Sequence, residues 1–91
     1  MFYAICYDIR DDHRRTHVAK VLKDYGERVQ YSVFEANVSA GELDRIKQRI
    51  RAVVDTREDT VRFYSLCGSC RERIDIIGEG CVTQDPDIIV V

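Results

Sequence analysis

The chain begins with a continuous apolar run, residues 2–9, that contains aromatic and β-branched side chains. A run without polar alternation is typical of a strand that is buried on both faces, so we expect this strand at the centre of a sheet. Asp11 or Asp12 follows as a helix cap, and apolar residues then recur at helical spacing. The pattern predicts a first helix over about residues 13–25, which Gly26 ends.

Residues 28–38 carry two alternating patterns in opposite phase. Val29, Tyr31 and Val33 share one phase, and Phe34 begins the other. Because the side chains of a strand alternate between its faces, a slip of one residue moves every later side chain to the opposite face. The chain must therefore bulge, bend or break near Val33 and Phe34. One kinked strand and two short arms both satisfy this pattern.

The second half of the chain predicts one more helix and further strands. Ser39 and Glu42 have the spacing of a capping box, and they precede an apolar stripe of helical spacing that ends near Asp55. Apolar segments bounded by turn residues then predict strands or arms over residues 59–66, 74–77 and 87–91.

This order of elements indicates an α+β fold in which two helices cover one face of a sheet. We expect a ferredoxin-like βαββαβ sandwich with an extra C-terminal strand. Residues 1–80 would form the ferredoxin-like domain, and residues 81–91 would form a strand or arm for subunit or partner contacts. Because an unpaired apolar strand invites aggregation, we expect it to pair with a second copy in a twofold homodimer.

Composition narrows the class of protein. The chain has 91 residues, of which 45% are hydrophobic and 33% charged, and its net charge is −2. This balance is typical of one small globular domain, and any binding of nucleic acid requires a local basic patch. No run approaches the ~18 apolar residues that a membrane span needs. We read the N-terminal run as neither a membrane helix nor a signal peptide, and expect a cytoplasmic protein without membrane contact.

Two of the four cysteines, Cys67 and Cys70, have Cys-x-x-Cys spacing. This spacing supplies half of a zinc site, and Cys6 and Cys81 do not form a second such pair. A redox pair of the thioredoxin type would open a helix within a βαβ unit, whereas Cys67 follows an apolar strand. We therefore interpret Cys67 and Cys70 as part of a turn with half-buried thiols, and a disulfide between them stays open.

Asp8 is the most informative single residue, because its carboxylate stands at the end of an apolar strand. Such a group needs a partner, which can be an amide, an arginine or a metal ion. Carboxylate oxygens suit Mg²⁺, which keeps several waters and often has only one or two protein ligands. One Asp8 is a poor site, whereas two copies of Asp8 that meet across a dimer axis are an adequate one. The alternative is an aspartate that only fixes the turn.

The segment from Arg10 to Arg28 is the second candidate for function. This segment contains six basic and four acidic residues, although the net charge of the whole chain is negative. Guanidinium groups match the bidentate geometry of phosphate oxygens, so a nucleic-acid backbone is a natural ligand. The alternative is a solvated helix surface. No glycine-rich phosphate loop and no serine–histidine–acid arrangement is apparent, which argues against nucleotide triphosphate hydrolysis and acyl transfer.

The sequence also resembles a known family. Tyr7-Asp8-Ile9, the segment 26–35 (GERVQYSVFE) and the segment 61–67 (VRFYSLC) with Cys70 are similar to the small CRISPR-associated protein Cas2. The resemblance implies ferredoxin-like homodimers with subunit contacts through the C-terminal strand. It also implies a magnesium-dependent endonuclease, with other divalent ions as alternatives, that cuts RNA or duplex DNA and that pairs with the CRISPR integrase Cas1 in spacer acquisition.

The same resemblance implies roles for single residues. Asp8 corresponds to the metal-binding and catalytic aspartate of the family, and Ser32 and Phe34 match positions linked to activity or to the dimer centre. From the basic segment and the resemblance together, nucleic-acid binding is expected of Arg14, Arg15 and Arg28.

Three functions follow as hypotheses. The first is a magnesium-dependent endonuclease that takes part in spacer acquisition. The second is a non-catalytic DNA-binding scaffold that bridges the Cas1 integrase. The third is a regulatory ferredoxin-like dimer that binds a small molecule, and its affinity for nucleic acid would show no salt dependence, whereas binding to a phosphate backbone weakens steeply with salt.

Overall fold

The computed structural model describes residues 1–80. Its elements in chain order are β1 (Phe2–Asp8), α1 (Asp12–Lys23), β2 (Glu27–Gln30), β3 (Val33–Asn37), α2 (Ala40–Arg51), β4 (Thr60–Leu66) and α3 (Gly68–Glu72). The strands form one antiparallel sheet in the order β2-β3-β1-β4. This confirms the α+β fold and the βαββαβ order. The predicted C-terminal arm, residues 81–91, lies outside the described residues.

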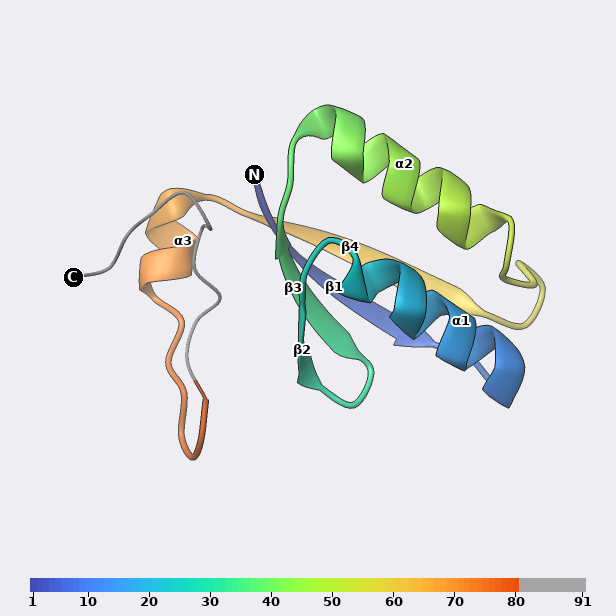
Figure 1. Cartoon of the computed structure of the whole chain (residues 1–91). Helices are drawn as coiled ribbons and strands as arrows, with labels where there is room; N and C mark the ends of the chain where they lie inside the picture. The colour runs from blue at the N-terminus through green and yellow to red at the C-terminus, as the bar shows by residue number, and fades with distance from the viewer. Residues whose placement is uncertain (81–91) are drawn as a thin grey trace.

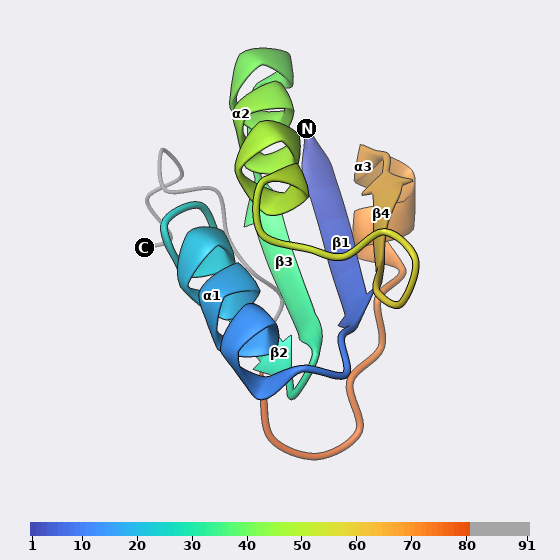
Figure 2. The same ribbon diagram turned by 90° about the vertical axis from the view of Figure 1, so that its right-hand side faces the viewer.

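Two layers make up the domain. Helices α1 and α2 lie on the same face of the sheet, and α3 lies beside the end of β4 (Figures 1 and 2). The core fills the space between the sheet and these two helices, and its largest fully buried side chains are Phe34, Ile5, Leu22, Ile46 and Val18. The face of the sheet that α1 and α2 leave open is called the uncovered face below. None of the helices in residues 1–80 is long and apolar enough to cross a membrane.

The central position predicted for the first strand is confirmed. β1 pairs with β3 on one side and with β4 on the other. Ile5 is fully buried and Tyr7 is nearly so, because both side chains point into the core. Successive residues of a strand face opposite sides of the sheet, so Cys6 and Asp8 belong to the uncovered face. Asp8, at the end of β1, is exposed.

Capping residues set the start of both long helices. The Asp11 carboxylate accepts a hydrogen bond of 2.9 Å from the backbone N–H of Arg14, so Asp11 rather than Asp12 is the cap. The capping box of α2 is confirmed, because Ser39 and Glu42 exchange side-chain to backbone hydrogen bonds of 3.1 Å in both directions. Helix α2 ends at Arg51, earlier than the apolar pattern predicts.

Residues 28–38, whose alternating pattern changes phase, form two short strands with a bulge between them and not one kinked strand. A turn at Tyr31 and Ser32 joins β2 to β3. The register between the two strands also shifts between Arg28 and Gln30. This bulge takes up the change of phase, because it adds one residue to one strand and none to its partner.

Gly26 is required by close packing and not by an unusual backbone angle. The described glycines with positive φ are Gly78 and Gly80, and Gly26 is not among them. A Cβ atom at Gly26 would lie 2.2 Å from the carbonyl oxygen of Glu35 and 2.8 Å from the Cβ of Ala36. The absence of a side chain therefore lets the segment between α1 and β2 lie directly against β3.

Two local predictions are wrong. Residues 74–77 do not form a strand, and Ile77 is fully exposed. A strand needs a neighbour that accepts and donates its backbone hydrogen bonds, and an apolar run alone does not provide one. The residues after β4 form α3 and not a simple turn, and the thiols of Cys67 and Cys70 are exposed and not half-buried.

Candidate nucleic-acid interface

A hollow lined by basic side chains lies between α1 and the turn that joins β2 to β3. It has a volume of about 280 Å³, and it is lined by Tyr7, Arg15, Thr16, Ala19, Lys20, Lys23, Arg28 and Tyr31. No acidic side chain of the described residues lines it. Four cations therefore surround a concave surface, which is the electrostatic environment that phosphate groups require. We call this site the basic hollow.

Arg15 is held in the basic hollow by two contacts. Its guanidinium donates a hydrogen bond of 2.9 Å to the carbonyl oxygen of Ile9, just after the end of β1. It also pairs with the Asp12 carboxylate one turn earlier in α1. The hydrogen bond to Asp12 raises the pKa of Arg15. Because these two contacts fix the side chain, its remaining N–H donors have a defined direction.

Arg28 enters the hollow from β2 and is positioned by an aromatic ring. Its guanidinium carbon lies 5.4 Å from the centre of the Phe34 ring, within the range of a cation–π interaction. Phe34 itself is fully buried, and its ring centre lies 6.2 Å from that of Tyr7. Phe34 therefore offers no surface for direct contact with a partner. It is linked to the hollow through Arg28.

The turn between β2 and β3 is tied to β1 at two points. The Tyr7 hydroxyl donates a hydrogen bond of 3.3 Å to the carbonyl oxygen of Tyr31. The Tyr7 backbone N–H donates one of 3.1 Å to the carbonyl oxygen of Ser32. Ser32 thus contributes its backbone here, and these bonds leave the Tyr31 side chain 73% exposed.

Tyr31 was missed as a functional residue in the sequence, where it counted only as one position of an alternating strand. An aromatic side chain among basic residues is the signal that could have identified it, because nucleic-acid surfaces combine cations with rings on which bases stack.

Arg14 is directed away from the basic hollow. Its Nε atom lies 2.8 Å from Oδ2 of Asp59, and one of its terminal nitrogens lies 3.2 Å from Oδ1 of the same carboxylate. Asp59 is buried and also accepts the backbone N–H of Asp55 at 2.9 Å. The Arg14 guanidinium holds the pKa of the Asp59 carboxyl below its usual range, while Asp59 raises the pKa of Arg14. This pair joins α1 to the segment before β4.

Asp8 lies on the uncovered face, next to the edge strand β4. It is opposite Thr60 in the β1–β4 register, and its side chain is exposed. No group of three or more metal-ligating side chains is found within residues 1–80. Residues 1–80 of a single copy therefore do not supply a complete set of side-chain ligands for Mg²⁺ at Asp8. This fits a shared site, in which a second copy or the nucleic acid supplies the remaining ligands.

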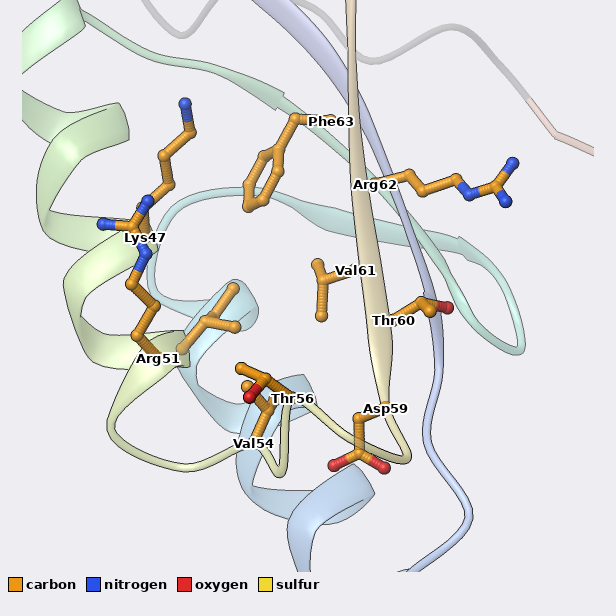
Figure 3. Close-up of a pocket in the computed structure, with 10 residues that line it drawn as sticks. Lys47, Arg51, Val54, Thr56, Asp59, Thr60, Val61, Arg62 and Phe63 are labelled. Atoms are coloured by element: carbon orange, nitrogen blue, oxygen red, sulfur yellow. The ribbon is translucent and has the colours of Figure 1, made fainter.

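A second hollow, of about 490 Å³, lies between α2 and β4 (Figure 3). Val54, Val61 and Phe63 form apolar walls, and the Lys47 ammonium lies 5.5 Å from the centre of the Phe63 ring. Arg62 extends from the other side of β4, away from α2 (Figure 3). The cations here do not surround one acid-free surface as they do in the basic hollow, because Asp59 also lines this hollow.

A family model described as CRISPR associated protein Cas2 matches residues 1–74. The chain belongs to the Cas2 family. A CRISPR-associated endoribonuclease Cas2 of Synechocystis sp. is 43% identical over 89 residues, which cover 98% of this chain and 97% of the relative. The crystal structure of Streptococcus pyogenes Cas2 is similar with a TM-score of 0.78 and 37% identity, and covers 86% of this chain and 100% of that one. A chain from a structure described as a partial Cas6-RT-Cas1–Cas2 complex has a TM-score of 0.78 and 30% identity, with coverages of 99% and 98%.

The positions marked by the Cas2 resemblance are distributed over two faces of the domain. Arg15 and Arg28 line the basic hollow beside the helices, and Phe34 lies beneath Arg28. Asp8 belongs to the uncovered face on the other side of the sheet. The structure therefore joins the two arginines in one site, and Asp8 is not among the residues that line it.

Proposed function

We propose that this protein is a magnesium-dependent endoribonuclease that acts as a homodimer in CRISPR adaptation. The observation that carries the proposal is the exposed Asp8 carboxylate on the uncovered face of the sheet, since a second copy has access to it there. Membership of the Cas2 family supports the proposal, as does the Synechocystis relative that bears the name endoribonuclease.

In the proposed dimer the uncovered faces of two sheets meet. Twofold symmetry then places one Asp8 opposite the other, and the two carboxylates hold Mg²⁺. Bound Mg²⁺ supplies charge neutralisation at the scissile phosphate and lowers the pKa of a coordinated water. The carboxylates bind and orient that ion, so both copies are needed for one active site.

The basic hollow binds the nucleic-acid strand at some distance from the bond that is cut. Arg15 and Arg28 bind phosphate oxygens with guanidinium groups whose directions Ile9 and Phe34 fix. Tyr31 stacks on an unpaired base, a contact that single-stranded RNA offers and a closed duplex does not. Arg14 is a positioning residue, because its pair with Asp59 holds the start of α1 in place.

A non-catalytic scaffold is the second candidate, and the similar chain from the Cas1–Cas2 complex favours it. In this function Cas1 is the partner, and the basic hollow holds duplex DNA by its backbone. The scaffold needs Arg15 and Arg28 but not the Asp8 carboxylate. The two functions can therefore be separated by mutation.

The test compares Asp8→Asn with wild type on single-stranded RNA and on duplex DNA, each with Mg²⁺ and with a chelator. Asp44→Asn, an exposed acid on α2, is the matched control. We expect Asp8→Asn to lose about 10²-fold or more of the RNA cleavage rate. The control should cut at the wild-type rate. Equal cleavage by wild type and Asp8→Asn would exclude a nuclease that depends on Asp8. Cleavage of duplex DNA but not of RNA would exclude RNA as the substrate.

The scaffold is tested in a spacer-acquisition assay. If it is the function, Asp8→Asn acquires spacers normally and the double variant Arg15→Gln/Arg28→Gln does not. Acquisition by the double variant at the wild-type level would exclude this function.

A further inference from the structure

Two exposed thiols lie side by side on the first turn of α3. Cys67 is the residue that precedes the helix, and Cys70 follows three positions later. Their Sγ atoms are 3.5 Å apart, and both residues are exposed. Cys6 differs from them, because it is only half-exposed in the central strand of the sheet. Neither Cys67 nor Cys70 has a part in the proposed nuclease.

The backbone already has the geometry that joins these two positions. The N–H of Arg71 donates a hydrogen bond of 2.9 Å to the carbonyl oxygen of Cys67, which closes the turn that contains both cysteines. Residues three apart on such a turn face the same side. The sulfurs of a disulfide are about 2.05 Å apart. Rotation of the two side chains that brings the Sγ atoms closer by roughly 1.5 Å would therefore form the bond with the backbone unchanged.

We propose that Cys67 and Cys70 form a thiol–disulfide exchange site that low-molecular-weight disulfides, such as oxidised glutathione, oxidise to an intramolecular disulfide. In the first step the Cys67 thiolate attacks one sulfur of the small disulfide and releases one small thiolate. In the second step the Cys70 sulfur gives up its proton, attacks Cys67 and releases the second small thiol. The protein loses two protons and two electrons, and the small disulfide gains them as it becomes two thiols.

The surroundings of the two sulfurs distinguish the attacking thiol from the resolving one. Hydrogen bonds from the Cys70 backbone N–H and from the Cys70 thiol lower the pKa of Cys67. The pKa of Cys70 is raised, chiefly by its hydrogen bond to Cys67. Cys67 therefore has more thiolate at neutral pH and attacks first, since the thiolate is the nucleophile in exchange.

Oxidation would fix the point at which the chain leaves the sheet. Helix α3 follows β4 directly, and the Arg71 guanidinium lies 4.6 Å from the centre of the Phe2 ring in β1. A disulfide across the first turn links residue 67, at the end of β4, to the residue next to Arg71. Oxidation would therefore restrain the first turn of α3 beside the contact between Arg71 and Phe2.

The experiment exposes the reduced full-length protein to oxidised glutathione, blocks remaining thiols with N-ethylmaleimide and maps the cysteines by peptide mass spectrometry. We expect a Cys67–Cys70 disulfide in wild type. In Cys70→Ser, glutathione should accumulate as a mixed disulfide on Cys67, because the resolving thiol is missing. In Cys67→Ser, modification of Cys70 should be slower than that of Cys67 in Cys70→Ser, because Cys70→Ser keeps the backbone N–H at position 70 that lowers the pKa of Cys67.

Cys6→Ser and Cys81→Ser are the matched controls, and both should form the same disulfide as wild type. Cys67 and Cys70 that stay reduced under conditions that oxidise a dithiol peptide standard would overturn the proposal. So would pairing of either residue with Cys81 or with a second chain. None of these measurements depends on nuclease activity. Their outcome therefore tests the exchange site independently of the proposed function.

Discussion

At the scale of single residues, the partner of a side chain decides its role more than its place in the sequence does. Arg14 and Arg15 are neighbours in α1 and have the same charge. The first is bound to the buried Asp59, and the second lines the basic hollow. The sequence predicts both as phosphate ligands. Their difference depends on a carboxylate 45 positions later in the chain, which no local pattern reveals.

Asp59→Asn should destabilise the protein and reduce the dependence of its stability on pH. The folded state lowers the pKa of Asp59 below its ordinary value of 3.8, so this carboxylate stabilises the fold above that pH. The contribution is lost as pH falls from about 3.8 through the lower pKa of the folded protein. At neutral pH the variant should melt about 5–10 °C below wild type.

Thermal unfolding followed by circular dichroism at a series of pH values measures this effect. Asp44→Asn is the control, because its carboxylate is exposed. The melting temperatures of Asp59→Asn and wild type should converge in acid. A constant difference between them at all pH values would show that the ionised Asp59–Arg14 pair is not the cause.

Arg28→Gln should weaken RNA binding and leave stability nearly unchanged. Arg28 is exposed and takes part in none of the ion pairs within residues 1–80, so its removal takes away a phosphate contact and the cation–π contact with Phe34 without breaking an ion pair. In a titration series the slope of log affinity against log salt should become less steep by about 1. Arg45→Gln on α2 is the control. A variant that keeps the wild-type slope would place the nucleic acid elsewhere.

At the scale of secondary-structure elements, prediction from the sequence succeeds where local chemistry decides the outcome. The apolar run of β1, the aspartate cap before α1 (predicted as Asp11 or Asp12, found at Asp11) and the capping box at Ser39 each act within a few residues. The segment 74–77 has the composition of a strand but forms none, because strand formation requires a partner far away in the sequence. The phase change in residues 28–38 was visible in the sequence, whereas the choice between one strand and two was not.

Gly26→Ala should destabilise the packing of the segment between α1 and β2 against β3. The added methyl group would overlap the carbonyl oxygen of Glu35, a backbone atom that cannot move without disturbing the β2–β3 pairing. Overpacking of this kind costs typically 1–3 kcal/mol. Urea unfolding gives the free energy, and Gly41→Ala is the control, because a Cβ there would meet Ser39 Oγ at 4.0 Å, which is an ordinary contact. Equal stability of Gly26→Ala and wild type would mean that the segment before β2 moves away from β3 at no cost.

At the scale of the whole molecule, one domain presents two candidate functional surfaces on opposite sides of its sheet. The basic hollow lies on the side of α1, and Asp8 belongs to the uncovered face. Both Asp8 and the basic segment were identified in the sequence, and the resemblance to Cas2 gave them roles. Their separation could not be predicted, because it follows from the alternation of β1 combined with the side on which α1 packs.

This separation allows dimer formation to be tested apart from RNA binding. Ala4 is half-buried in β1 on the uncovered face, opposite Glu35 of β3 and Tyr64 of β4. An arginine there places a charge and a long side chain at the centre of the proposed subunit contact, where like charges of two copies would meet. We expect Ala4→Arg to be a monomer in analytical ultracentrifugation and to lose magnesium-dependent cleavage, while its affinity for RNA at low salt falls by no more than a few-fold.

Ala52→Arg is the matched control, because Ala52 is exposed at the end of α2, on the other side of the sheet. It should remain a dimer and should cut RNA at the wild-type rate. Circular dichroism establishes that both variants are folded. If Ala4→Arg is a monomer and still cuts RNA at the wild-type rate, one Asp8 is sufficient and the shared metal site is wrong. If it remains a dimer, the subunits meet through another surface and the two Asp8 carboxylates are not brought together by this face.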